Sequence, residues 1–225
     1  MQWLRRLSIK SKLIVMLLTV SSCSILVTAY LGYRSGQSNL TSRVFSQLTS
    51  LRSSKADQIE SYFKTVRNHI QTLSEDPTIV TATSEFTSTY RQLETVKIPP
   101  AFNQKLTAYY RDEFLPKLAK TEQGSPLLNS FLPDSAASFY LQYHYIAANP
   151  NPIGKKNLLN VALDSSNYSR IHARYHPIFH NIIKKFGYYD MFFINAQGRV
   201  VYTVYKETDF ATNLTNGAYS ESNLA

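Results

Sequence analysis

The sequence predicts an α+β protein, in which an N-terminal transmembrane helix continues into a long stalk helix, followed by a helical region and the start of an antiparallel sheet. Three observations predict this fold class: an uncharged apolar run near the N-terminus, apolar residues at helical spacing through the middle of the chain, and β-branched and aromatic runs near its end. The expected boundaries are a basic tail over 1–12, a transmembrane helix over 13–31, a stalk helix over 32–76 and a final region over 77–225.

The apolar run over 13–31 contains no charged residue. As an α-helix that rises about 1.5 Å per residue, it approaches the ~30 Å thickness of the bilayer hydrocarbon core. The basic residues that precede it are Arg5, Arg6, Lys10 and Lys12. Because basic residues beside a span stay in the cytoplasm, we expect the inner (plasma) membrane, a cytoplasmic N-terminus and extracytoplasmic residues after about 34.

Charge and cysteine content exclude several classes of protein. The formal net charge is +9, but four of the basic residues lie in the N-terminal tail and no Lys/Arg run exceeds two residues. Nucleic acid is therefore not an expected partner. The single cysteine, Cys23, lies within the predicted span, so the chain beyond it has no disulfide and no cysteine-based metal or nucleophile site.

The stalk carries an apolar stripe at steps of three or four residues, with Lys55 in its one polar position. Its apolar members are Leu40, Val44, Leu48, Leu51, Ile59, Phe63, Val66, Ile70 and Leu73. The pair Asp76-Pro77 ends the helix, which we expect from about Ser38 to Glu75. Such a stripe packs against the protein's own core or pairs in parallel with a second copy to form a homodimer. Both can hold, with the membrane-proximal half pairing and the distal half packing.

Four further helices are expected between the stalk and the sheet. They cover 79–93, 102–118, 135–146 and 165–186, with breaks at 98–100, 123–126 and 149–154. Ser165 and Ser166 are suited to cap the last helix, and Gly187 is suited to end it in a left-handed conformation. Pro177 is expected to kink that helix or divide it in two.

The pattern then changes from helix to strand. Residues 190–194 and 200–205 are rich in β-branched and aromatic side chains, and the residues between them include Gly198. This arrangement predicts a β-hairpin with a five-residue turn over 195–199. Two strands alone are marginally stable, so the sheet needs further packing partners.

At the hairpin the chain resembles a known family. Residues 186–194 and 198–210 look like the first sheet of an extracytoplasmic double Cache sensor domain, and 143–156 and 168–177 resemble other parts of the same sensor regions. Such regions occur in bacterial, notably cyanobacterial, membrane-bound adenylate/guanylate cyclases and in sensor histidine kinases. The resemblance implies PAS-like α/β modules, a small-molecule ligand outside the cytoplasm, a second span and a cytoplasmic output domain.

The same resemblance indicates where a ligand would bind. A PAS-like fold places its pocket or the rim of its pocket at the hairpin ends, and the chain has 16 Tyr and 12 Phe, whose rings are suited to line such a pocket. The candidate ligand-binding residues are Tyr188, Tyr189, Asp190, Tyr202, Lys206 and Asp209. Core packing is the expected role of most other aromatic residues.

Catalytic, metal and cofactor sites are not indicated. His172, His176 and His180 are spaced by four, as metal ligands on one helix face can be, but Pro177 interrupts the geometry and no acidic residue lies near them in sequence. Surface or hydrogen-bonded histidines are the favoured reading. The carboxylate pairs are adjacent in sequence and suit solvated helix positions, so we expect no enzyme activity in this chain.

These expectations combine into the anchor and partial sensor region of a bacterial signal-transduction receptor, with the output domain, best guessed as a cyclase, outside this chain. The chain is then a fragment or a truncated gene product. The parent is alternatively a histidine kinase or a chemoreceptor. Two further alternatives are a periplasmic binding module released by signal-peptide cleavage near Val27-Thr28-Ala29, and a nonfunctional remnant.

Overall fold

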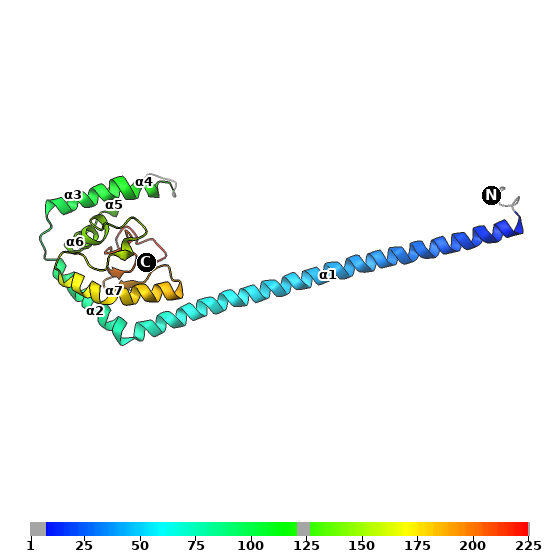
Figure 1. Cartoon of the computed structure of the whole chain (residues 1–225), viewed down its shortest axis with the longest axis horizontal. Coiled ribbons are helices and arrows are strands. Elements are labelled where there is room, and N and C mark those ends of the chain that lie inside the picture. The colour runs from blue at the N-terminus through cyan, green and yellow to red at the C-terminus, as the bar shows by residue number, and fades with distance from the viewer. Residues whose placement is uncertain (1–7, 121–126, 225) are drawn as a thin grey trace. The chain divides into compact units, whose positions relative to one another are not determined.

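The computed structural model describes residues 8–120 and 127–224, which form two compact units (Figure 1). The first unit ends at Gln71 and the second begins at Thr72. The described part of the first unit is helical from Ile9 onward, whereas the second unit combines several helices with a small sheet, as expected for an α+β protein. The predicted break at 123–126 and the basic residues Arg5 and Arg6 lie outside the described residues.

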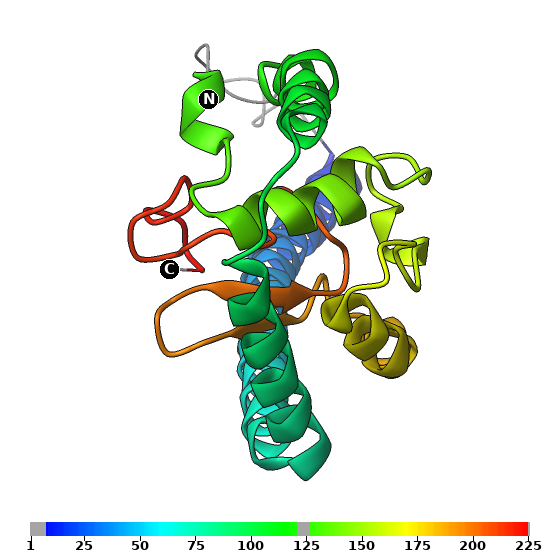
Figure 2. The same ribbon diagram turned by 90° about the vertical axis from the view of Figure 1, so that its left-hand side faces the viewer.

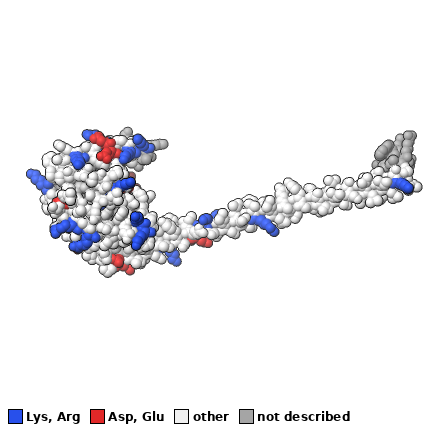
Figure 3. Space-filling view, in the orientation of Figure 1, with Lys and Arg blue, Asp and Glu red and all other residues white. Residues whose placement is uncertain are grey.

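Helix α1 runs without interruption from Ile9 to Glu75, so the predicted span and stalk form a single helix whose predicted end at Glu75 is confirmed. By length and composition it is able to cross a membrane. Figure 3 shows basic side chains at the start of this helix and, after them, a stretch without charged side chains. The hydroxyls of Thr19, Ser24 and Thr28 donate to backbone carbonyls of their own helix, which satisfies them without water.

Helix α2 covers Pro77–Leu93. Asp76 caps it, since its carboxylate accepts hydrogen bonds from the backbone N–H groups of Thr78 (2.7 Å) and Ile79 (3.3 Å). Capping by Asp76 and the proline after it explain why α1 ends and a new helix begins at this point.

The second predicted helix is built from three consecutive helical segments. They are α3 (Pro100–Tyr109), the π-helix η2 (Tyr110–Phe114) and α4 (Leu115–Leu118). Helix α5 (Leu128–Phe131) follows, then α6 (Ala136–Gln142), the π-helix η3 (Tyr143–Ala147) and the 3₁₀ turn η4 (Lys156–Leu158). The predicted helices over 102–118 and 135–146 are therefore confirmed, each with a π-helical turn.

Helix α7 runs from Asn167 to Phe186 and passes through Pro177, so the predicted division of this helix is wrong. A proline removes one backbone hydrogen bond from a helix. That loss is tolerated because α7 buries aromatic side chains on both sides of the proline, among them Tyr175 and Phe179. Gly187 ends the helix in the left-handed region at φ 69°, as predicted.

The hairpin is confirmed, with shorter strands than predicted: β1 (Phe192–Ile194) and β2 (Val200–Thr203) pair antiparallel, with an irregularity between Phe193 and Ile194. Gly198 adopts φ 72° in the turn. The segment after β2 folds back and pairs with the start of β2, where the Val200 N–H donates to the Thr212 carbonyl at 2.9 Å. Figure 2 shows the hairpin beside α2.

The core of the second unit is aromatic. The Phe86 ring of α2 stacks on the Tyr202 ring of β2 with centroids 4.6 Å apart, and the Phe179 ring of α7 meets the Phe193 ring of β1 at 4.9 Å. All four side chains are almost fully buried. Because they come from two helices and both strands, the hairpin obtains from the helices the packing that two strands lack.

Candidate functional site

The candidate site is a buried group of polar and aromatic side chains around the end of β2. We call it the Lys206 cluster. Its members are His172, Asp190, Lys206 and Asp209, with the rings of Tyr145, Tyr202 and Phe210. Tyr145 belongs to η3, His172 to α7 and Tyr202 to β2. Asp190 lies two residues before β1, and Lys206, Asp209 and Phe210 lie in the segment after β2.

Lys206 is the centre of the cluster because its side chain turns inward after β2. Only 1 % of its surface is exposed. The backbone adopts φ 57°, in the left-handed region. Its N–H donates to Thr203 Oγ1 at 3.0 Å, and its ammonium donates to the Thr203 carbonyl. Burial lowers the pKa of Lys206 to about 7, although the nearby charge of Asp190 opposes this shift.

Three aromatic rings surround the Lys206 ammonium. Its Nζ atom lies 4.1 Å from the centroid of the Tyr202 ring, 5.0 Å from that of Phe210 and 5.7 Å from that of Tyr145. A cation is attracted to the negative face of such rings, and more strongly so when water is absent. The three rings therefore form an aromatic cage that the protein's own lysine occupies.

Two carboxylates belong to the cluster and neither is fully hydrogen-bonded. Asp190 Oδ1 accepts from the backbone N–H groups of Met191, Val204 and Tyr205, which joins the start of the hairpin to its end. Asp190 Oδ2 and Asp209 Oδ1 are buried without a hydrogen-bond partner.

Their surroundings raise the pKa of both acids. Burial raises the pKa of Asp209 to about 7, and the charges of Asp190 and Glu207 add to the shift. Burial also raises the pKa of Asp190, against the effect of its backbone hydrogen bonds and of Lys206.

His172 and His176 extend the cluster along α7. His172 Nδ1 lies 2.7 Å from the Asn160 carbonyl and His176 Nε2 lies 2.7 Å from the Asn157 carbonyl, so both of these nitrogens carry the proton. His176 Nδ1 then accepts from the Tyr202 hydroxyl at 2.7 Å. Both rings are buried and stack with centroids 4.4 Å apart.

Burial is the main reason why both imidazoles are neutral. It lowers the pKa of His176 to about 3 and that of His172 well below its usual range, and the charge of Lys206 adds to both shifts. His172 Nε2, an acceptor in this tautomer, has no partner. Both ring nitrogens of His176 are already bonded, which leaves no lone pair for a metal ion.

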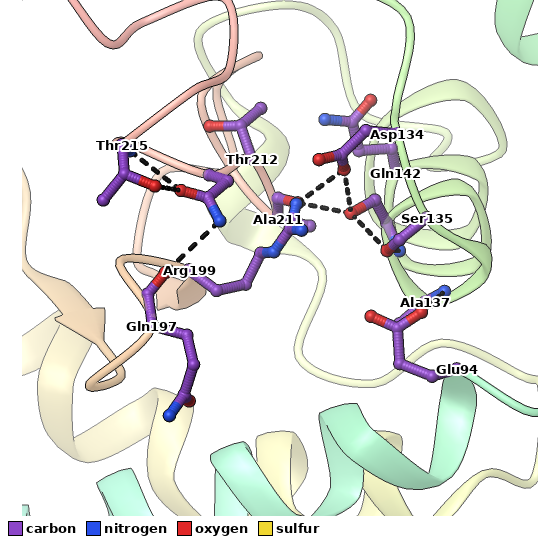
Figure 4. Close-up of polar contacts among 12 residues, drawn as sticks. Glu94, Asp134, Ser135, Ala137, Gln142, Gln197, Arg199, Ala211, Thr212 and Thr215 are labelled. Carbon is purple, nitrogen blue, oxygen red and sulfur yellow. Dashed lines mark hydrogen bonds and ion pairs between the residues drawn. The ribbon is translucent and has the colours of Figure 1, made fainter.

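The segment that carries Asp209 and Phe210 is held in place by α6. Gln142 Nε2 donates to the Phe210 carbonyl at 2.7 Å, and the Ser138 hydroxyl donates to the Ala211 carbonyl at 2.6 Å. Beside these contacts, Arg199 and Asp134 form an ion pair at 2.6 Å (Figure 4). The wall of the cluster therefore depends on contacts between α6 and a segment about 70 residues later in the chain.

The structure brings together four of the six candidate residues: Asp190, Tyr202, Lys206 and Asp209. The other two lie apart from the cage. Tyr189 is 75 % exposed and donates to Glu207 at 2.7 Å, and the half-buried Tyr188 stacks on Phe186.

The sequence interpretation missed three members of the cluster: Tyr145, His172 and Phe210. Tyr145 and Phe210 resembled ordinary core residues. His172 was interpreted as a surface or hydrogen-bonded histidine, and the structure shows a buried hydrogen-bonded one. The available signal was the four-residue spacing of His172 and His176, which places both on one face of α7.

No metal centre is found within the described ranges 8–120 and 127–224, where no three or more His, Cys, Asp or Glu residues are grouped to hold an ion. Comparisons with protein families, curated proteins and solved structures find no match for this chain. Among the described residues, the Lys206 cluster and helix α1 are the features from which a function can be proposed.

Proposed function

We propose that this chain is the membrane-anchored, extracytoplasmic sensor portion of a bacterial signal-transduction receptor, which binds a small molecule at the Lys206 cluster. The observation that carries the proposal is the cluster itself. Buried polar atoms in folded proteins nearly always have hydrogen-bond partners, and here Asp190 Oδ2, Asp209 Oδ1 and His172 Nε2 have none. Strongly perturbed pKa values in one small region are likewise typical of functional sites.

The membrane part of the proposal rests on α1. Its apolar stretch follows Lys10 and Lys12 and ends before Arg34, and its large apolar side chains there are exposed. The basic residues before the apolar stretch favour a cytoplasmic N-terminus and an extracytoplasmic second unit. Cleavage after this stretch is the alternative, and a mature N-terminus near Tyr30 would demonstrate it.

The relay part of the proposal rests on the stalk stripe. Leu48, Leu51 and Ile59 are each more than half exposed, and they recur at the spacing of a coiled-coil seam. A second copy of this chain supplies the matching stripe in a parallel homodimer. A ligand that binds one arrangement of the two stalks more tightly than the other shifts the equilibrium between them. The output domain that would respond is, by the stated resemblance, a nucleotide cyclase or a histidine kinase.

The test uses the full chain in lipid nanodiscs. In the first experiment, thermal unfolding is measured with a panel of amines, carboxylates and sugars. A compound that raises the unfolding midpoint is then added to a Cys23→Ser, Leu51→Cys variant, and its effect on the rate of disulfide formation between two stalks is measured. We expect one class of compound to stabilise the wild type and to change the cross-linking rate. If no compound does either, the sensor proposal is wrong.

A control identifies the site of binding. Asp209→Ala should abolish the stabilisation by the active compound, because it alters the cluster. Glu221→Ala, at an exposed position near the end of the described chain, should leave the stabilisation unchanged.

A further inference from the structure

The unpaired atoms of the Lys206 cluster are all hydrogen-bond acceptors. Asp190 Oδ2 and Asp209 Oδ1 are carboxyl oxygens. His172 Nε2 is an acceptor because the proton is on Nδ1, which donates a hydrogen bond to the Asn160 carbonyl. All three lie close enough to influence Lys206 or Asp190 electrostatically. None of the three receives a hydrogen bond from a group of the described chain, the Lys206 ammonium included.

The cage beside these acceptors is suited to a positive charge. Tyr145, Tyr202 and Phe210 present their rings to the Lys206 Nζ atom at 4.1–5.7 Å. Lys206 has one recorded hydrogen bond from this ammonium, to the Thr203 carbonyl, and forms no ion pair with a carboxylate of the described chain. The lysine thus occupies the cage without satisfying the acceptors around it.

The backbone that carries the lysine is strained. Lys206 and Ala211 both adopt positive φ angles, 57° and 64°, without being glycine. Such a conformation is unfavourable for a residue other than glycine, and it is concentrated at ligand clamps and switch regions. Between them lie Asp209 and Phe210, which supply one unpaired acceptor and one wall of the cage.

We propose that the Lys206 cluster is a binding site for a small organic ammonium ion, and that the Lys206 side chain is a built-in competitor which occupies the cage until the segment 205–212 opens. The inference rests on the proposed sensor function and assigns its ligand class. An ammonium ligand would place its charge among the three rings and donate to the two carboxylates and to His172.

Other ligand classes fit the cluster less well. An anion would meet two carboxyl groups. An apolar molecule would leave the three acceptors without hydrogen bonds in a dry environment, which is unfavourable for each of them. A cation without N–H groups would satisfy the rings only. A primary ammonium supplies both the charge and the three donors.

The test measures binding of methylammonium by isothermal titration calorimetry, with the full chain in nanodiscs at pH 7. Lys206→Met shortens the side chain by one atom and removes its charge, which frees the position of Nζ. We expect methylammonium to bind this variant roughly tenfold more tightly than the wild type. Lys206→Arg, which keeps an internal cation, should show no gain.

Three controls make the result specific. Lys185→Met changes an exposed lysine of α7 and should bind methylammonium as the wild type does. Adding Asp209→Asn to Lys206→Met should remove the gain. Tetramethylammonium, a cation without donors, should bind Lys206→Met more weakly than methylammonium does. Far-ultraviolet circular dichroism establishes that each variant is folded.

Two outcomes overturn the inference and separate it from the proposed function. If folded Lys206→Met gains no affinity for methylammonium while the wild type is stabilised by an anionic or neutral compound at this site, the ligand class is wrong and the sensor function stands. If neither protein binds any compound of the panel, both the inference and the proposed function fail.

Discussion

Lys206 lies in an environment that its charged side chain does not prefer. An ammonium ion loses its hydration when it is buried, and aromatic rings replace only part of that stabilisation. Its neighbours Asp190 and Asp209 are themselves difficult to ionise, because burial raises the pKa of each. Apolar side chains at this position would give a more stable core. The buried charge therefore indicates that Lys206 serves a function other than stability.

The stability of a Lys206→Met variant tests this argument. The pKa of Lys206 is about 7 in the folded protein, whereas its ordinary value, which applies to the unfolded chain, is 10.5. Burial of the charged lysine therefore lowers the free energy of unfolding by its full amount below pH 7, and this loss disappears as the pH rises toward 10.5. We expect the variant to be more stable by about 2 kcal/mol at pH 6 and by less at pH 9. Urea unfolding of the full chain in detergent micelles, followed by tyrosine circular dichroism, measures the difference; a less stable variant at pH 6 would contradict the prediction.

His176 provides a second test at the scale of a single residue. Its pKa falls from 6.5 to about 3 on burial, so its neutral form contributes stability that is present above pH 6.5 and is lost as the pH falls toward 3. Gln at this position does not titrate. We expect the free energy of unfolding of His176→Gln to change less between pH 7 and pH 5 than that of the wild type, by on the order of 1–2 kcal/mol.

The control for this test is Asn181→Gln, at an exposed position of α7, because this substitution changes no titratable group. The free energy of unfolding of this control should depend on pH as that of the wild type does. If the free energy of unfolding of His176→Gln also depends on pH as that of the wild type does, His176 is not held neutral by burial.

Among the elements, the end of α7 determines where the hairpin begins. Gly187 adopts φ 69°, and no atom lies within 4 Å of the position that a Cβ would occupy. A substitution there is therefore a test of backbone conformation alone. We expect Gly187→Ala to destabilise the second unit by about 1 kcal/mol and Gly187→Asn by less, since Asn tolerates the left-handed region. Thermal unfolding of both variants measures the order, and an Ala variant as stable as the wild type would disprove the role of Gly187.

For the molecule as a whole, the proposed pairing of stalks predicts a pattern of disulfide cross-links. Leu51 lies on the apolar stripe of α1, and Ser53 lies about 200° around the same helix. In a Cys23→Ser background, we expect oxidation of membranes to yield covalent dimers with Leu51→Cys and few or none with Ser53→Cys. Non-reducing electrophoresis distinguishes them, and equal yields from the two positions would argue against a stalk coiled coil.

Local patterns determined much of this protein. The end of α1 at Glu75, the start of the last helix near Ser166, its stop at Gly187 and the hairpin turn at Gly198 all follow from residues within a few positions of each boundary. Proline, capping and glycine effects act over one helical turn or less, so they are readable without tertiary contacts. A kink or a division was expected at Pro177, and the division does not occur, because packing on both sides of the proline outweighs its local effect.

Tertiary structure alone decided what surrounds Lys206. The sequence by itself determined that Asp190, Tyr202, Lys206 and Asp209 lie near the hairpin ends, since a hairpin brings its two ends together. The cage also needs Tyr145 from η3, and the unpaired acceptors include His172 from α7, both far from Lys206 in the chain. Whether a lysine is solvated or buried among rings depends on the packing of these distant elements, which no spacing within one segment reveals.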